Sequence, residues 1–266
     1  TFVFAIGILV IPSMVFSFGG ACTTDANCLA GEVCKNLICS LKQEITVSVT
    51  VPGAAPPPTG GGGTPPPTVI LKGKAYPNAF VTIFRDGAVT GTAQAGSDAL
   101  FSKELVAVPA GTHTFGIQAE DSAGRLSPIV NITLSLANGT VTTVSNIFLP
   151  PTIEVVPATL QRGNTLRVFG YIFPRSQVSV FINSVVSQFV SAADSGLWEY
   201  LFDTSSLGLG SHTTRAKATS PTGEISDFSQ TKPFEVVGVV PVPPVPPAPA
   251  PPAPPAPAPP LPEELA

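Results

Sequence analysis

The chain has 266 residues, enough for two ordinary domains, with 11% charged residues and a formal net charge of −4. Average proteins carry about a quarter charged residues, so this is not the composition of a typical cytosolic enzyme. The sequence has no run of Lys and Arg, which argues against nucleic acid as a partner because phosphate binding needs clustered cations. The 24 Gly, 31 Pro and 16 Phe, together with abundant Val, Ile and Thr, indicate β structure.

Residues 1–21 are an apolar run followed by small residues, the pattern of a secretory signal peptide. Neither Met nor a basic region precedes the apolar run, so we expect a reading frame truncated at its N-terminus. Residues 2–18 approach the length that spans a bilayer, and an uncleaved anchor is the alternative. A lipoprotein acylated on Cys22 is less favoured, because Gly19 stands where such signals usually carry Leu. We therefore expect export, with membrane contact only through the signal or an anchor.

A four-Cys module follows at residues 22–40. An even number of cysteines directly after an export signal predicts two disulfides, because so short a segment cannot bury a core without covalent bridges. Zinc ligands usually include closer pairs such as C-x2-C, so zinc is the less favoured reading. The pattern C-x-x-D-x-x-C-x-x-G-x-x-C resembles short Cys-rich modules of secreted proteins, which implies first-to-third and second-to-fourth pairing; the residues alone leave three pairings open. The cysteines are Cys22, Cys28, Cys34 and Cys39.

Residues 41–67 are expected to form a linker that contains one short strand. The stretch "EITVSVTV" alternates as a strand does, whereas residues 52–68 mix Pro and Gly without apolar periodicity.

Beyond the linker the chain repeats itself, which predicts one domain at residues 68–149 and another at 150–238. "GKAYPNAFVTIF" aligns with "GYIFPRSQVSVF" at an offset of 97, and "AGTHTFGIQAEDSAGRLS" aligns with "LGSHTTRAKATSPTGEIS" at 99. A period of this size corresponds to one immunoglobulin-sized sandwich per copy. The equivalent positions that we interpret as structural are Gly73, Pro77, Phe101 and His113 in the first copy and Gly170, Pro174, Trp198 and His212 in the second.

Turn signals within the copies support strands. Asp86-Gly87 favours a type I′ hairpin, the second copy turns at Asn183-Ser184, and Asn138-Gly139 predicts a further hairpin. No stretch between these signals has a convincing helical period. The predicted fold is all-β: two tandem Ig-like β-sandwiches with a small disulfide-stapled N-terminal module and a polyproline II tail.

The two copies resemble the bacterial Ig-like domains that occur in tandem on surface and adhesin-type proteins. The resemblance rests on G-x-x-x-P before "VTIF" or "VSVF", the Asp/Gly turn ahead of Phe101 or Trp198, and G-x-H-T at a strand start. "AEDSAGRLS" is similar to the family's A-x-D-x-x-G-x-x-S ending. The resemblance implies the sandwich fold and leaves the function open, because such sandwiches serve many roles.

One cluster, "GTHTFGIQAED", suggests a metal or acid–base site. However, His113 recurs as His212, whereas the two carboxylates after it do not recur. Seven extended residues at about 3.3 Å each also put His113 roughly 23 Å from Glu120 along one strand. We therefore interpret the histidines as scaffold. Calcium remains a less favoured alternative because the sequence lacks a dense D-x-D-x-D run; its candidate ligands are Asp98, Glu120 and Asp121.

No other motif carries chemistry. The sequence lacks a G-x-S-x-G elbow, a Walker loop and H-E-x-x-H, so we expect neither catalysis nor a cofactor. A glycan-binding face would need exposed aromatic platforms; Trp198 is expected in the core, and Tyr76 and Tyr171 are too few to argue from.

Residues 239–266 are expected to form a stalk. Between 241 and 262 the chain has 14 prolines in 22 residues, which favours polyproline II. At about 3.1 Å per residue this segment spans roughly 70 Å as a semi-rigid spacer. A ligand for SH3- or WW-type domains is the alternative, which an exported location disfavours.

These observations predict a non-enzymatic, exported cell-surface protein whose Ig-like modules act as stalk, spacer or adhesive units. We expect an elongated monomer with an extracellular protein or glycan ligand. The alternative is the accessory region of a secreted or cell-wall enzyme, or of a docking or scaffold protein, whose functional module lies beyond residue 266.

Overall fold

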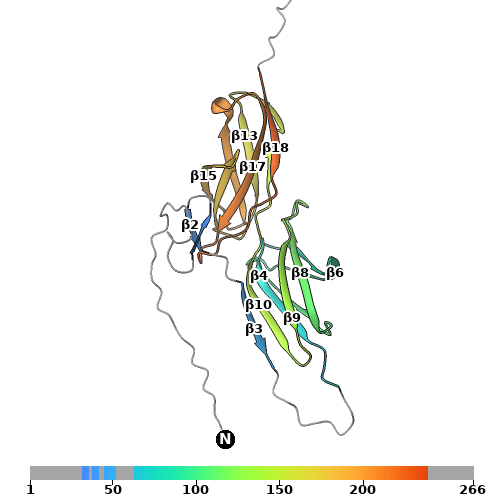
Figure 1. The fold of residues 1–266 in the computed structure, drawn as a ribbon. Coiled ribbons are helices and arrows are strands. Elements are labelled where there is room, and N and C mark those ends of the chain that lie inside the picture. Colours follow the sequence, from blue (N-terminus) through green and yellow to red (C-terminus); the bar gives the residue numbers. More distant parts are fainter. Residues whose placement is uncertain (1–31, 36–37, 42–44, 52–62, 239–266) are drawn as a thin grey trace, which may run out of the picture.

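The computed structural model describes residues 32–35, 38–41, 45–51 and 63–238 (Figure 1). Apart from the single turn of 3-10 helix η2 (Thr204–Ser206), every regular element in this part of the chain is a strand, which confirms the all-β prediction. No helix among the described residues is long and apolar enough to cross a membrane. The signal peptide predicted at residues 1–21, Cys22 and Cys28, the centre of the linker and the Pro-rich tail lie outside the described residues.

The first sandwich packs two four-stranded sheets, ordered β3-β10-β4-β7 and β6-β5-β8-β9. A separate hairpin pairs β1 with β2 and sets Cys34 opposite Cys39. These strands are β1 (Glu32–Lys35), β2 (Ile38–Leu41), β3 (Thr46–Thr50), β4 (Thr68–Lys74), β5 (Phe80–Arg85), β6 (Ala88–Gln94), β7 (Leu100–Leu105), β8 (Gly111–Glu120), β9 (Val130–Leu136) and β10 (Val141–Phe148).

The second sandwich packs a three-stranded sheet, β11-β13-β16, on a five-stranded sheet, β12-β18-β17-β14-β15. Its strands are β11 (Glu154–Val156), β12 (Thr159–Gln161), β13 (Thr165–Tyr171), β14 (Gln177–Ile182), β15 (Val185–Ser191), β16 (Leu197–Asp203), β17 (Gly210–Thr219) and β18 (Lys232–Val237). Figure 1 shows the two sandwiches arranged end to end.

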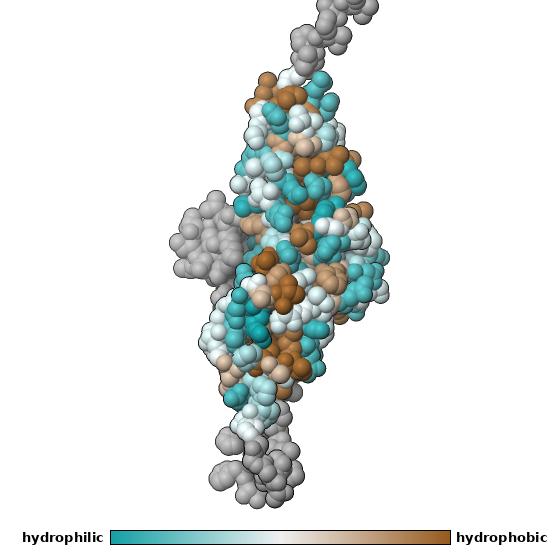
Figure 2. Space-filling view, turned by 90° about the vertical axis from the view of Figure 1, so that its right-hand side faces the viewer, coloured by the Kyte–Doolittle hydropathy of each residue, from teal (hydrophilic) through white to brown (hydrophobic). Residues whose placement is uncertain are grey.

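Alternating apolar residues form the core of each sandwich. In β13, Leu166 and Val168 are fully buried, whereas the residues between them point outward. Trp198 is 1% exposed and its counterpart Phe101 is 4% exposed, so both rings lie in the core. On the face seen in Figure 2, hydrophobic residues form small groups separated by hydrophilic ones.

Two of the predicted hairpin turns are present. Asp86 and Gly87 connect β5 to β6, and Asn183 and Ser184 connect β14 to β15, all four with the positive φ angles that a type I′ turn requires. The hairpin predicted at Asn138-Gly139 is wrong. The chain turns there, but β9 and β10 belong to opposite sheets, so the turn carries the chain from one layer of the sandwich to the other.

Strand β10 distinguishes the first sandwich from the second. In the second sandwich β13 has the first strand, β11, as its antiparallel neighbour. In the first sandwich the corresponding place beside β4 is taken by the last strand, β10, which runs parallel to β4. The short strand expected in the linker, β3, extends this sheet by pairing antiparallel with β10.

The direction of β10 decides how the copies meet. Because β10 runs parallel to β4 and leads directly toward β11, β4 ends at the boundary between the sandwiches. Strand β13 also ends there, because it runs antiparallel to β11. The copies follow one another head to tail in sequence but meet through the same end in space.

Candidate functional site: the joint between the sandwiches

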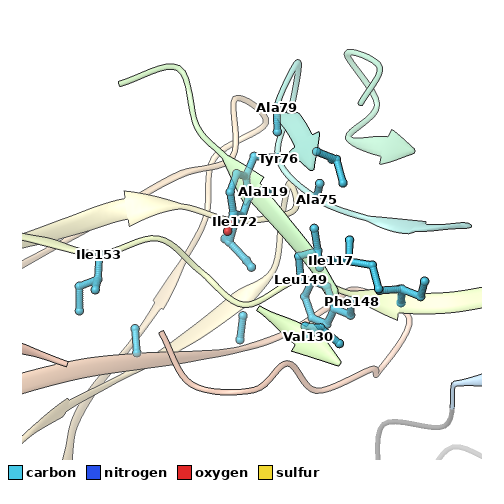
Figure 3. Close-up of a cluster of buried hydrophobic side chains, with 14 of the residues drawn as sticks. Ala75, Tyr76, Ala79, Ile117, Ala119, Val130, Phe148, Leu149, Ile153 and Ile172 are labelled. Carbon is cyan, nitrogen blue, oxygen red and sulfur yellow. The ribbon is translucent and has the colours of Figure 1, made fainter. Parts of the chain in front are cut away.

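The two sandwiches are connected by a buried segment. Residues 147–153 are all buried, although they join one domain to the next. The Tyr76 hydroxyl donates a hydrogen bond to the carbonyl oxygen of Pro150, and burial raises the pKa of this phenol. Figure 3 shows Tyr76 and Ile172, from different sandwiches, close to one another in the buried cluster that also contains Leu149. Connections between domains usually run over the surface, whereas this one is buried. The segment is therefore part of a core that the two sandwiches share.

A glycine at equivalent positions of the two copies lies on each side of this segment. A Cβ atom on Gly73 would lie 2.2 Å from the Ile147 carbonyl oxygen, and one on Gly170 would lie 2.0 Å from the Thr152 carbonyl oxygen. Both glycines therefore allow a close approach of two backbones, one at β10 and one just before β11.

Prolines mark the turns that face each other here. Pro77 and Pro174 each follow the strand that ends at the joint, β4 and β13. A Cβ atom on Gly196 of the second sandwich would lie 2.8 Å from Pro77 Cδ of the first. The turns of the two sandwiches are therefore in direct contact.

Asp121 lies at the centre of the polar part of the joint, with a fully buried side chain. Its Oδ1 accepts from the backbone N–H groups of Ala123, at 2.9 Å, and Arg125, at 3.1 Å. Its Oδ2 accepts from Arg125 Nε at 2.8 Å and from the Thr152 hydroxyl at 2.7 Å. A buried carboxylate needs a positive partner and several donors. Arg125 supplies the positive charge, and Thr152 ties the carboxylate to the connecting segment.

Arg125 also crosses to the second sandwich. Its guanidinium carbon lies 5.0 Å from the ring centroid of Phe169 and 5.5 Å from that of Tyr171, both on β13. Arg167 covers Phe169 at 4.0 Å and pairs with Glu199 at 2.8 Å. Stacked cations and rings of this kind hold the first sandwich against the outer face of β13.

One ion pair joins residues of the two different sandwiches. Lys74 Nζ lies 2.6 Å from Glu224 Oε1 and 2.6 Å from the Thr222 hydroxyl, and 5.4 Å from the ring centroid of Phe173. Burial raises the pKa of Glu224, but hydrogen bonds from Lys74, Ser220 and Thr222 outweigh it and hold the pKa at about 2. The side chains are 17% and 25% exposed, so this pair is better shielded than an ordinary surface pair.

The remaining calcium candidates lie in separate local contacts. Asp98 Oδ1 accepts from the backbone N–H of Leu100 at 3.0 Å, within the turn before β7. Glu120 forms an isolated backbone bridge with Leu126. Within the part of the chain that the structure describes, no group of three or more His, Cys, Asp or Glu is arranged to hold a metal ion.

The histidine of the first sandwich lies at the end away from the joint, where β8 begins. His113 Nδ1 is 2.6 Å from Asp86 Oδ2, and His113 Nε2 is 3.1 Å from the Pro109 carbonyl oxygen. Asp86 Oδ1 accepts from the Thr114 N–H at 2.9 Å. The hydrogen bonds from His113 and then from Thr114 lower the pKa of Asp86.

The second histidine makes the same connections. His212 Nδ1 is 2.8 Å from Asn183 Nδ2, and its Nε2 is 2.9 Å from the Gly208 carbonyl oxygen. Asn183 Oδ1 accepts from the Thr213 N–H at 3.1 Å. In each copy a histidine therefore fastens the hairpin turn to the loop before the next strand, and His113 and Glu120 lie at opposite ends of β8.

Sequence reasoning missed the joint. Four of its polar residues were not identified as candidates. For two of them the alignment of the copies does contain a signal, because Arg125 and Glu224 occupy equivalent positions but carry opposite charges. The other two, Lys74 and Thr152, gave no signal because their partners are distant in sequence.

No protein-family model matches this chain, and neither does any curated protein. Among solved structures, the fibronectin(III)-like modules of CbhA from Clostridium thermocellum are 12% identical, over 72% of this chain and 94% of theirs, with a TM-score of 0.26. A putative membrane anchored protein from Corynebacterium diphtheriae is 13% identical over 63% of this chain, with a TM-score of 0.32. The BSP domain of a biofilm associated protein is 21% identical over 61%, with a TM-score of 0.28. The chain spans 46% and 25% of the length of the latter two. TM-scores this low carry no information about function.

Proposed function

We propose that this chain belongs to a non-enzymatic, exported cell-surface protein in which the two sandwiches form one rigid spacer. The observation that carries the proposal is the joint: a buried connection of seven residues, braced by Asp121 with Arg125 on one side and by Lys74 with Glu224 on the other. A flexible pair of domains would need neither a buried connection nor an ion pair and cation–ring contacts across it.

The two sandwiches follow one another lengthwise, as this role requires. Strand β4 starts at the far end of the first sandwich, and β18 finishes at the far end of the second. The joint lies between these two ends, and β3, which runs back along β10, starts on the side of the joint. The apolar run at residues 1–21 and the Pro-rich segment at 239–266 support export and continued extension.

Spin labels test the rigidity directly. With one label at Thr92 and one at Ser211, both exposed, we expect a single narrow distance distribution between the sandwiches. Labels at Ser191 and Ser211, both within the second sandwich, give the reference width. If the first distribution is several times broader than the second, the sandwiches move independently and the spacer proposal is wrong.

A further inference from the structure

The repeat allows the outer faces of two equivalent sheets to be compared residue by residue. In the first sandwich Thr82 on β5 lies opposite Thr92 on β6 and Gln118 on β8. In the second sandwich the equivalent row has Ser179 on β14, opposite Phe189 on β15 and Lys217 on β17. A polar row in one copy has become an aromatic ring and a cation in the other.

The neighbouring row differs in the same way. Phe84 lies opposite Gly116 in the first sandwich, and Phe181 lies opposite Arg215 in the second. Each pair follows a core residue, Ile83 or Val180, and so lies on the outer face; Phe181 is nevertheless only 5% exposed, because the ring of Phe228 packs against it at 5.1 Å. Beside this row the second copy has Phe228 where the first has Ile129, at the same offset of 99.

Arg215 is held on aromatic rings. Its guanidinium carbon lies 3.9 Å from the ring centroid of Phe228 and 5.9 Å from that of Phe181. Its Nε is buried and has no hydrogen-bond partner, and the ion pairs found among the described residues do not include it. A guanidinium fixed by stacking has lost much of its freedom before any carboxylate binds.

The fold does not need a side chain at this position. In the first sandwich the place of Arg215 is occupied by Gly116, and a Cβ atom there would lie 2.9 Å from Ile129 Cγ2. Ile129 thus covers this part of the sheet in the first sandwich, and no cation is present there. The arginine of the second copy is an addition to the scaffold.

Phe189 and Lys217 border a shallow strip between them. Phe189 is 54% exposed, and the small side chain of Ser179 lies between it and Lys217. With neighbouring strands about 4.8 Å apart, the two larger residues are separated by about 10 Å across this strip. Lys217 Nζ lies 5.5 Å from the Phe228 ring, on the same side as Arg215.

We propose that this face of the second sandwich binds a carboxylated polysaccharide. Arg215 and Lys217 bind its carboxylates through charge-assisted hydrogen bonds, and Phe189 stacks on a sugar ring. This inference adds a ligand to the proposed function and rests on its cell-surface location.

A sugar chain fits the face better than an acidic protein. A stable protein interface buries about 800 Å² on each partner around an apolar centre. On this sheet the exposed large hydrophobic residues are Val185 and Phe189, too few for such a centre. A single polyanionic chain needs only the cations and one ring.

The test measures binding of the full chain to two immobilised polyuronates, polygalacturonate and alginate. Methyl-esterified polygalacturonate is the neutral control with the same backbone. We expect binding to at least one polyuronate, at least about tenfold weaker to the ester and weaker at high salt. Poly-glutamate is included as an acidic protein-like polymer.

Three variants assign the site: two copy the residue of the first sandwich, and Arg215→Gln removes the charge while keeping a polar side chain. Lys217→Gln and Arg215→Gln should each weaken polyuronate binding about tenfold, and Phe189→Thr about fivefold. Arg167→Gln on the opposite sheet and Phe80→Thr in the first sandwich are matched controls that should bind normally; Phe80 is 49% exposed. Melting curves check that each variant is folded.

Three outcomes overturn the proposal: no binding to either polyuronate, normal binding by all three variants, or tighter binding to poly-glutamate than to both polyuronates. The last would assign the face to an acidic protein. None of them affects the spacer role, because the spin-label distances are measured without any polymer.

Discussion

Replacing Asp121 with Asn tests whether the joint couples the stabilities of the two sandwiches or is only a contact between them. The substitution keeps Oδ1 for the backbone N–H groups of Ala123 and Arg125. It places an amide NH2 where Oδ2 had accepted from Arg125 Nε and from the Thr152 hydroxyl. Two donors then face a third donor, and the charge of Arg125 is no longer balanced.

The expected loss follows from these contacts. A hydrogen bond to a charged group contributes about 1.5–3 kcal/mol, and breaking a buried ion pair costs about 3–5 kcal/mol. Arg125 is 15% exposed, so the lower end applies and the first sandwich should lose about 3 kcal/mol. The contact with Thr152 belongs to the second sandwich, which should lose about 1.5 kcal/mol.

Trp198 makes this second loss measurable. It is the one Trp in the sequence and lies in the core of the second sandwich, so its fluorescence during urea unfolding monitors that sandwich alone. With an m value of about 1.5 kcal/mol/M, its midpoint should fall by about 1 M. The matched control is Asp86→Asn, at the far end of the first sandwich. If the fluorescence midpoint of Asp121→Asn moves no further than that of the control, the coupling does not exist.

Acid should weaken the joint as Glu224 is protonated: its contribution is complete above the unfolded pKa near 4.5 and is lost as the pH falls toward about 2. The partly exposed Lys74–Glu224 pair contributes about 1 kcal/mol to the stability of the joint. The distance distribution between labels on the two sandwiches should therefore broaden at low pH in the wild type and stay unchanged over this pH range in Glu224→Gln. Removing calcium with a chelator should leave the melting temperature unchanged, because Asp121 already accepts from protein donors at both oxygens; a shift of several degrees would restore the calcium hypothesis. Gly170→Ala should destabilise the second sandwich by more than about 2 kcal/mol, because its Cβ atom would meet the Thr152 carbonyl oxygen. The control Gly208→Ala has open space around the new Cβ atom and should change the stability by less than about 0.5 kcal/mol in the same urea titration.

The sequence predicted the strands and the repeat well because both depend on local patterns. Alternating apolar residues and the Asp86-Gly87 turn specify a hairpin from neighbouring residues alone. The shared histidine position could be recognised in the same way, since His113 and His212 occupy equivalent places in two copies of one motif.

The joint could not be predicted because its contacts are non-local. Lys74 and Glu224 are separated by 150 positions, and the equivalent residues of the other copy, Tyr171 and Arg125, are not of the same type, so the repeat does not link the two. The turn at Asn138-Gly139 likewise has one local signal for two arrangements, a hairpin within a sheet or a crossing between sheets. Which one forms depends on where β10 can bury Val144 and Ile147, and both are fully buried beside β4.

The parallel partnership of β10 with β4 determines how the first sandwich responds to tension. Tension applied between Thr68, at the start of β4, and the second sandwich draws Thr68 away from the joint and Phe148, at the end of β10, toward it. The strands are then loaded in shear, so that the backbone hydrogen bonds of six paired positions resist together instead of opening one at a time. The second sandwich has the same geometry in β12 and β18, which are also parallel but share three paired positions. Stretched from both ends, the second sandwich should therefore yield before the first.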